Sequence, residues 1–377
     1  MYYLDNAATT PVLPFVADAV YEAMTKYFGN PSSLYNIGMH SERVIEDARK
    51  RVAKTLGCKP EELYFTACGT ESNNIAIQGA IFARQAWGKS IVCTGFEHPS
   101  VHKQIERLQK QGYRVTFIMP DMRGKVDETA IVNAVQADTC LAAFMHVNNE
   151  VGTKLNVEDI AKRIKEKNSR TAIHVDGVQA WGKVEVELGK SAIDSYSISG
   201  HKVHTPKGVG GLYLRKGFNI DVPFLGGGQE KGIRPGTENI PYIVGLATAA
   251  DAFANKLNEN HKHFTALAEL LKSKLAKFEN VVINSPEDAV PYIVNFSVLG
   301  MRSEVLLHYL EEREIFVSSG SACSKGAASH TLLAMKLDEK RIDGALRVSF
   351  NAQNKEEDVL ALINELQNAE KELLKIK

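Results

Sequence analysis

The sequence has no excess of charge of either sign and no long hydrophobic run. Its 377 residues carry 45 Lys plus Arg against 45 Asp plus Glu, so the formal net charge is zero. This balance argues against recognition of nucleic acid or of an anionic membrane surface by bulk charge. No apolar run is long enough to span a bilayer, and the start MYYLDNAATTP lacks the basic residues and apolar core of a secretory signal. We therefore expect a cytoplasmic protein.

Cysteine is scarce as well. The five cysteines are scattered and odd in number, and no two of them form a C-x-x-C pair. A disulfide framework and a structural zinc site are therefore disfavoured, and we predict no bound metal. Cys93 and Cys140 stand in apolar, strand-like runs, where free cysteine is usually a small buried hydrophobe.

Neither of the common nucleotide-binding motifs is present. Gly88-Lys89-Ser90 resembles the end of a phosphate loop, but the glycine required five positions before Gly88 is Ala83. No G-x-G-x-x-G opens a helix after the first strand, so dinucleotide binding has no support either. A cofactor bound through either of these nucleotide-binding motifs is therefore disfavoured.

The pattern that is present alternates short, apolar, β-rich runs with amphipathic stretches of helical period. Such alternation predicts right-handed crossovers and an α/β fold with a mainly parallel sheet covered on both faces. We place a large domain at 15–255 and a smaller one at 1–14 plus 256–377. Strands are predicted at 62–67, 90–95, 113–119, 139–147, 171–176 and 194–199.

Polar clusters follow several of these strands, at the edge where parallel sheets bind ligands. The segment 68–74 opens a helix whose N-terminus suits a phosphate, although plain capping by Thr70 is the alternative. His98 could stack on an aromatic ring or move protons, or it could simply cap the next helix. Asp176 ends a strand, where a carboxylate can hold a protonated ring nitrogen or cap a helix. Lys202 follows the last of these strands and is either an imine-forming amine or an ordinary surface lysine.

Each cluster is a weak signal by itself. Together they provide a phosphate cradle, a ring partner, an acid for a pyridine nitrogen and an amine that can form an imine. This is the set of groups that pyridoxal 5'-phosphate (PLP) requires.

The sequence also resembles a known family, the NifS/IscS-type cysteine desulfurases of the class V aminotransferase group, over nearly its whole length. The resemblance implies the fold of the type I PLP enzymes: a PLP domain with a mainly parallel, seven-stranded sheet and a smaller α+β domain. The motifs that carry it are 4–11 (LDNAATTP), 29–33 (GNPSS), 97–98 (EH), 146–152 (HVNNEVG), 174–176 (HVD), 199–202 (SGHK), 234–239 (RPGTEN) and 318–323 (SSGSAC).

The resemblance implies a role for each matching residue. Lys202 would bind the cofactor covalently, Asp176 the ring nitrogen, and Gln179 the phenolic oxygen, with Asn149 at the same ring edge. His98 would stack on the ring and relay protons. The phosphate would be held by Gly69, Thr70, Ser199 and His201. Thr237 would reach the phosphate of a neighbouring subunit, which implies a homodimer, and the substrate carboxylate would be bound by Arg347 with help from Asn30.

Cys323 stands in SSGSACSKGAAS, a run of small residues that can bury little apolar surface. We expect an exposed, mobile loop there, with a free thiol whose thiolate is a nucleophile. The resemblance implies that L-cysteine is converted to L-alanine, that the sulfur passes to Cys323 as a persulfide, and that an acceptor protein then takes it for iron–sulfur cluster assembly or tRNA thiolation.

Three other functions stay open on the sequence. Selenocysteine lysis and transamination use the same fold, and a non-catalytic interaction protein could also have kept it. The thiol of Cys323 favours sulfur transfer, because a transaminase needs no mobile thiol. Cys68 replaces the small residue usual before Gly69, which we expect to affect packing only. The segment after Cys323 and the C-terminus are both short for the housekeeping iron–sulfur members, so the sequence does not choose the acceptor.

Overall fold

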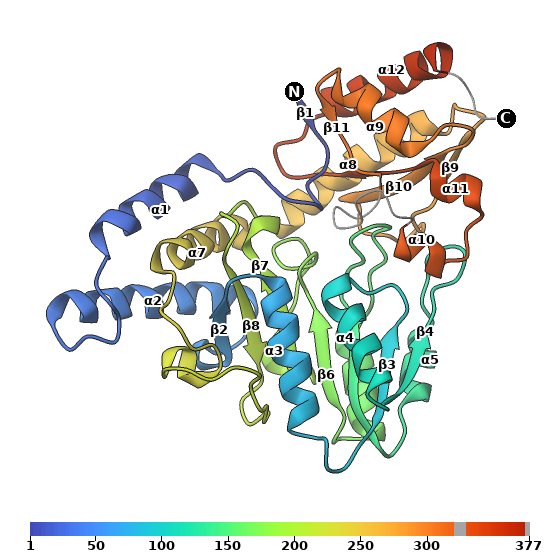
Figure 1. The fold of residues 1–377 in the computed structure, drawn as a ribbon. Coiled ribbons are helices and arrows are strands. Elements are labelled where there is room, and N and C mark those ends of the chain that lie inside the picture. Colours follow the sequence, from blue (N-terminus) through green and yellow to red (C-terminus); the bar gives the residue numbers. More distant parts are fainter. Residues whose placement is uncertain (320–328, 374–377) are drawn as a thin grey trace.

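A seven-stranded sheet forms the centre of the larger part of the molecule (Figure 1). The computed structural model describes residues 1–319 and 329–373, so the predicted sulfur-accepting Cys323 lies outside the described residues. Only β8 runs antiparallel to its two neighbours, and the other four pairs are parallel. Across the sheet the order is β2 (Leu63–Thr66), β8 (Gly210–Leu214), β7 (Ser195–Ser199), β6 (Ala172–Asp176), β5 (Thr139–Met145), β3 (Ser90–Thr94) and β4 (Arg114–Ile118).

Helices cover both faces of this sheet, as the continuous burial of its central strands requires. Successive side chains of a strand point to opposite faces, so Ile91 and Cys93 pack with α3 (Gly69–Phe82) and α4 (Pro99–Lys110), whereas Val92 packs on the other side. That other side is covered by α2 (Asn36–Thr55), α5 (Glu128–Ala134), α6 (Val157–Lys167) and α7 (Ile240–Ala254). Helix α1 (Pro14–Lys26) packs against α7.

The C-terminal part has its own hydrophobic cluster, and the chain's first residues belong to it. Leu4 and Ala7 pack in this cluster with the apolar faces of α8 (Leu257–Leu275) and α12 (Glu356–Glu372). Strand β1 (Tyr2–Tyr3) pairs in parallel with β11 (Ile315–Phe316). The remaining elements here are the antiparallel sheet β12 (Ala345–Ser349), β10 (Ile293–Val298) and β9 (Val281–Ile283), with α9 (Ser303–Glu311), α10 (His330–Ala334) and α11 (Glu339–Asp343).

The fold class and all six predicted strands of the main sheet are confirmed. Burial of Cys93 and Cys140 is confirmed too, since each is 1% exposed. The reversed direction of β8 was not predicted, because a buried strand reads the same in either direction. The division at residues 14/15 and 255/256 stays a prediction. Among the described residues, no helix combines the length and apolarity needed to cross a bilayer.

Candidate active site

The predicted site residues converge on the carboxyl edge of the large sheet. Asp176 and Ser199 are the last residues of β6 and β7, and Lys202 follows in the short helix η3 (Gly200–Lys202). His98 caps α4 after β3, and Gly69 begins α3 after β2. Parallel strands bring their ends to one edge, so these residues meet although up to 133 positions separate them along the chain, from Gly69 to Lys202.

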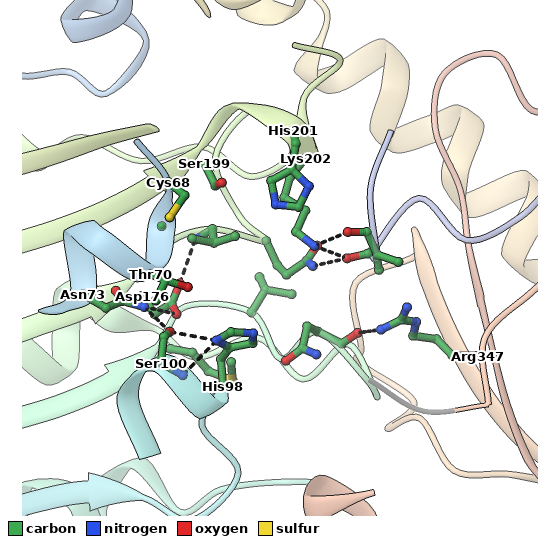
Figure 2. A pocket seen from close by; sticks show the side chains of 18 residues that line it. Cys68, Thr70, Asn73, His98, Ser100, Asp176, Ser199, His201, Lys202 and Arg347 are labelled. Carbon is green, nitrogen blue, oxygen red and sulfur yellow. Dashed lines mark hydrogen bonds between the residues drawn. The ribbon is translucent and has the colours of Figure 1, made fainter. Parts of the chain in front are cut away.

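They surround a cavity of about 200 Å³. Ten of the predicted site residues line it, among them Arg347 on β12 in the C-terminal part, together with residues from the N-terminus and from the large sheet (Figure 2). Its lining consists of Ala7, Ala8, Cys68, Gly69, Thr70, Asn73, His98, Ser100, Met145, Val147, Asn149, Asp176, Val178, Gln179, Ser199, His201, Lys202 and Arg347.

The amine of Lys202 lies in the cavity, against the N-terminal segment. Its Nζ donates hydrogen bonds of 2.6 Å to the carbonyl oxygens of both Ala7 and Ala8. Figure 2 shows these bonds on one side of the cavity, with Asp176 and His98 across from them. An amine and a carboxylate therefore share one cavity, as a pyridine aldehyde with a basic ring nitrogen would require.

The imidazole of His98 is held by Ser100. Its Nδ1 lies 2.7 Å from the Ser100 hydroxyl and accepts a hydrogen bond of 3.1 Å from the Ser100 backbone N–H. Burial lowers the pKa of His98, and the charge of Lys202 acts in the same direction, whereas Asp176 opposes both. The ring is therefore neutral near pH 7, with the proton on Nε2.

The predicted phosphate-binding residues also line the cavity. The hydroxyl oxygen of Ser199 is buried and has no hydrogen-bond partner among the described residues. The side chain of Cys68, at the N-cap of α3, makes no capping bond to that helix. Burial, followed by the charge of Lys202, lowers the pKa of His201 to about 3, so this ring is neutral. A buried hydroxyl beside an open helix N-terminus suits a phosphate.

Gln179 and Arg347 reach the cavity from other directions. The Gln179 amide donates to the Ala7 carbonyl at 2.8 Å, and its Oε1 is buried without a partner among the described residues. Arg347 is 1% exposed and donates to the Asn149 carbonyl at 2.8 Å and to the Asp5 carboxylate at 2.6 Å. Its Nε has no partner in the described part of the chain, so the guanidinium keeps a donor for a substrate carboxylate.

Two predicted residues do not reach this cavity within one chain. Asn30 is exposed and accepts a hydrogen bond from the backbone of Ser32, and Thr237 is exposed as well. For Thr237 this matches the expectation of a contact across subunits, which stays a prediction. Within 1–319 and 329–373 no group of three or more His, Cys, Asp or Glu side chains is arranged to hold a metal ion.

The sequence reasoning gave no role to several residues that the fold brings here. Asn73 and Ser100 line the cavity, and the Asp5 carboxylate pairs with Arg347. Cys68 also lines the cavity, and the expectation that it affects packing only stays a prediction. Asn73 carried a usable signal: it shares the buried face of α3 with Ile77 four positions on, and a polar residue on an apolar helix face needs an explanation.

Comparisons with known proteins agree with this geometry. Residues 2–362 match the family model described as Aminotransferase class-V. A protein named Cysteine desulfurase IscS from Methanosarcina thermophila is 40% identical over 360 residues, which cover 95% of this chain and 89% of that protein. A solved structure titled NIFS-LIKE PROTEIN has a TM-score of 0.93 at 36% identity and covers 98% of this chain and 99% of its own. Another, titled SspA in complex with cysteine, has a TM-score of 0.82 at 31% identity and covers 93% and 99%.

The chain belongs to the class V aminotransferase family of PLP-dependent enzymes. Within that family it is a cysteine desulfurase of the IscS/NifS type. PLP fits the residues present, because the buried Ser199 hydroxyl, the Asp176 carboxylate and the Lys202 amine match its phosphate, ring nitrogen and aldehyde.

Proposed function

We propose that the chain transfers the sulfur of L-cysteine to Cys323 as a persulfide and releases L-alanine. The observation that supports this most directly is that the chain on both sides of Cys323 is held at the cavity. Ser318 exchanges two backbone hydrogen bonds with Arg347, a cavity residue. Ser329 binds the carboxylate of Glu150, whose neighbour Asn149 lines the cavity.

The proposed roles combine the family resemblance with the place of each side chain at the cavity, and the role of Asn30, which lies outside the cavity of one chain, rests on the resemblance alone. Lys202 would bind the cofactor and remove the α-proton of cysteine. Asp176 would keep the ring nitrogen protonated, and Gln179 would bind the phenolic oxygen with Asn149 beside it. Gly69, Thr70, Ser199 and His201 hold the phosphate. Bound PLP supplies an acceptor for the electron pair that the departing proton leaves behind. His98 would stack on the ring and relay protons through Nε2, and Arg347, with help from Asn30, would bind the substrate carboxylate.

The sulfur step joins the substrate sulfur to one protein thiolate, and the bound cofactor would stabilise the carbon that loses the sulfur. The Cys323 thiolate forms a bond to the substrate sulfur while the carbon–sulfur bond breaks. The electron pair of the broken bond remains with the carbon, which takes a proton and becomes the methyl group of alanine. The sulfur is then a persulfide on Cys323, ready for an acceptor thiol.

Labelled sulfur tests this assignment. The enzyme is mixed with one equivalent of L-cysteine carrying radioactive sulfur, alkylated and digested. We expect the label on the peptide that contains Cys323, releasable by a reducing thiol, in step with the alanine formed. Label found on the Cys68 peptide, or alanine formed with free sulfide alone, would contradict the assignment.

We further propose that an acceptor protein takes this sulfur for iron–sulfur cluster assembly or for thiolation of tRNA. The two destinations can be separated by presenting the labelled enzyme with a cluster scaffold protein and with a tRNA-thiolating enzyme together. The acceptor that gains label at the faster rate is the partner. Label retained on the enzyme in the presence of both would contradict both destinations.

Glu150 provides a test of how the Cys323 segment is anchored. Its buried carboxylate accepts hydrogen bonds from the hydroxyls of Ser329 and Thr331, just beyond that segment. Glu150→Ala leaves both hydroxyls without this acceptor, at about 1–3 kcal/mol each. We expect persulfide formation to slow by about tenfold or more while the amount of bound PLP is unchanged. Labelling rate and cofactor absorbance are the measurements, with the exposed Glu166→Gln as the control. Equal labelling rates in both variants would show that this anchor is dispensable.

We propose that the enzyme is a homodimer in which Thr237 reaches the phosphate bound by the partner subunit. Large apolar side chains are exposed on α1 and in the segment leading to α2. Phe28 is 74% and Leu34 97% exposed. Exposed apolar clusters of this kind mark association surfaces.

The dimer is tested by light scattering. We expect the double variant Phe28→Glu, Leu34→Glu to have half the mass of the wild type and to bind PLP more weakly. Leu360→Glu, on α12, alters an exposed apolar residue elsewhere and should leave both properties unchanged. A wild-type chain that is monomeric at micromolar concentration would exclude the shared site.

A further inference from the structure

Asn73 is a buried amide at the back of the cavity, and every hydrogen-bonding position of its side chain is used. It stands in α3 and is 1% exposed. Its Nδ2 donates to the Asp176 carboxylate and to the Ser100 hydroxyl, each at 2.8 Å. Its Oδ1 accepts from the Ser197 hydroxyl at 2.6 Å and lies 2.9 Å from Nε2 of His174. One side chain on α3 therefore joins β6, β7 and the first turn of α4.

These contacts fix the orientation of the amide. A carboxylate oxygen can only accept, so the amide nitrogen must face Asp176. The amide oxygen then faces His174, whose Nε2 must carry a proton and whose Nδ1 lies 2.9 Å from the Ser195 hydroxyl. Burial lowers the pKa of His174 to about 4, so this ring is a neutral donor. A rotated amide would place oxygen against carboxylate and lose the bond to Asp176.

The same amide fixes His98 through one intermediate. The Ser100 hydroxyl accepts from Asn73, which leaves its own proton to point at Nδ1 of His98, 2.7 Å away. The Ser100 backbone N–H donates to the same nitrogen. With two donors aimed at Nδ1, the ring cannot easily take a second proton there. Among the described residues, the charges of Asp176 on β6 and of Lys202 on η3 act on His98, and His98 in turn acts on His201.

Asp176 is fixed on both oxygens. Oδ1 accepts from the backbone N–H of Val178 at 3.0 Å, within its own turn, and Oδ2 accepts from Asn73. The first bond alone would let the carboxylate swing about it. The second bond comes from another element and sets the plane of the group relative to His98. Figure 2 shows Asn73, Ser100, His98 and Asp176 grouped on this one side of the cavity.

We propose that Asn73 is the positioning residue that orients the Asp176 carboxylate and the His98 imidazole together. The inference rests on the proposed roles of these two residues toward PLP. The hydrogen bonds of the Asn73 side chain all go to other side chains of the protein, so it acts through those residues. It holds the Asp176 carboxylate in one plane and the His98 imidazole in one tautomer. The nitrogen and the face of the PLP ring would then each contact a side chain of fixed orientation.

The experiment compares Asn73→Ala with Asn74→Ala, its neighbour, whose amide bonds only within α3. In Asn73→Ala we expect the dissociation constant of PLP, measured by absorbance on reconstituting the apoenzyme, to rise about tenfold. We expect the acid limb of the kcat profile to move up by about 0.5–1 pH unit, because the released Ser100 hydroxyl can accept from a protonated Nδ1. Asn74→Ala should change neither quantity.

Ser100→Ala separates the effect of Asn73 on His98 from its effect on Asp176. It is also the test to use if Asn73→Ala does not fold. It should shift the acid limb and leave the PLP dissociation constant at the wild-type value. The proposal is overturned if folded Asn73→Ala matches Asn74→Ala in both quantities, or if Ser100→Ala leaves the acid limb in place. The variants His98→Ala and Asp176→Ala distinguish a failure of the role given to Asn73 from a failure of the proposed function. If these two variants also leave the PLP dissociation constant and the acid limb unchanged, the roles given to His98 and Asp176 fail. If they change these quantities and Asn73→Ala does not, only the role of Asn73 fails.

Discussion

Cys323→Ser should abolish alanine production from L-cysteine, by more than about a thousandfold, while PLP remains bound. A hydroxyl at this position has no populated anion near neutral pH and cannot attack the substrate sulfur. The cavity residues that hold the cofactor are untouched by the change. Alanine release and the yellow absorbance of the bound cofactor, measured on the same preparation, separate the two effects.

Two other cysteines are the controls for this variant. Burial raises the pKa of Cys58 to about 12, so it stays a thiol at neutral pH and Cys58→Ser should retain full activity. Cys68 is the rival, because it lines the cavity. Full activity in Cys323→Ser together with loss in Cys68→Ser would transfer the sulfur-accepting role to Cys68.

Lys202→Ala should lose desulfurase activity by about a thousandfold or more, together with covalent cofactor binding. The wild-type amine lies in the cavity, where two backbone carbonyls hold it at 2.6 Å, and no other lysine lines that cavity among the described residues. The yellow absorbance of a lysine-bound cofactor should vanish. After borohydride reduction of the wild type, the cofactor should be found on the peptide that contains residue 202.

At residue 202 the effect of the positive charge can be separated from the ability of the amine to form an imine. Lys202→Arg keeps a cation beside the same carbonyls but has no amine able to form an imine, so it should be as inactive as Lys202→Ala. Lys207→Ala removes an exposed lysine five residues away and should be as active as the wild type. Reduced cofactor recovered on any peptide other than that of residue 202 would refute the assignment.

Local sequence patterns were sufficient to predict most strands of the large sheet. Runs such as SIVCT and AIHVD are apolar, short and rich in β-branched residues, so they form strands in almost any α/β context. The reversal of β8 was beyond such reasoning, because GGLYL is buried on both faces and carries no mark of direction. The pairing of β1 with β11 was also hidden, since two residues give no periodicity to read.

The candidate reacting groups could be picked out because of their own chemistry, and the structure brings them into one cavity. Lys202 and Asp176 stand at strand ends, where an amine and a carboxylate are costly unless they have a use. The residues that hold these groups in place could not be predicted in the same way. Asn73 is 103 positions from Asp176, and Glu150 is 179 positions from Ser329, so nothing local relates them.

The sequence by itself determined the α/β class, the positions of the main strands and a set of candidate groups that meet in one cavity. Those properties depend on residue type and on short-range periodicity, which the chain carries wherever it folds. The tertiary structure alone decided which buried donors face which acceptors, and hence the tautomer of His98, the plane of Asp176 and the pairing of Arg347 with Asp5. A hydrogen bond is set by distances of a few tenths of an ångström between segments far apart in the chain, and only the packed fold fixes those distances.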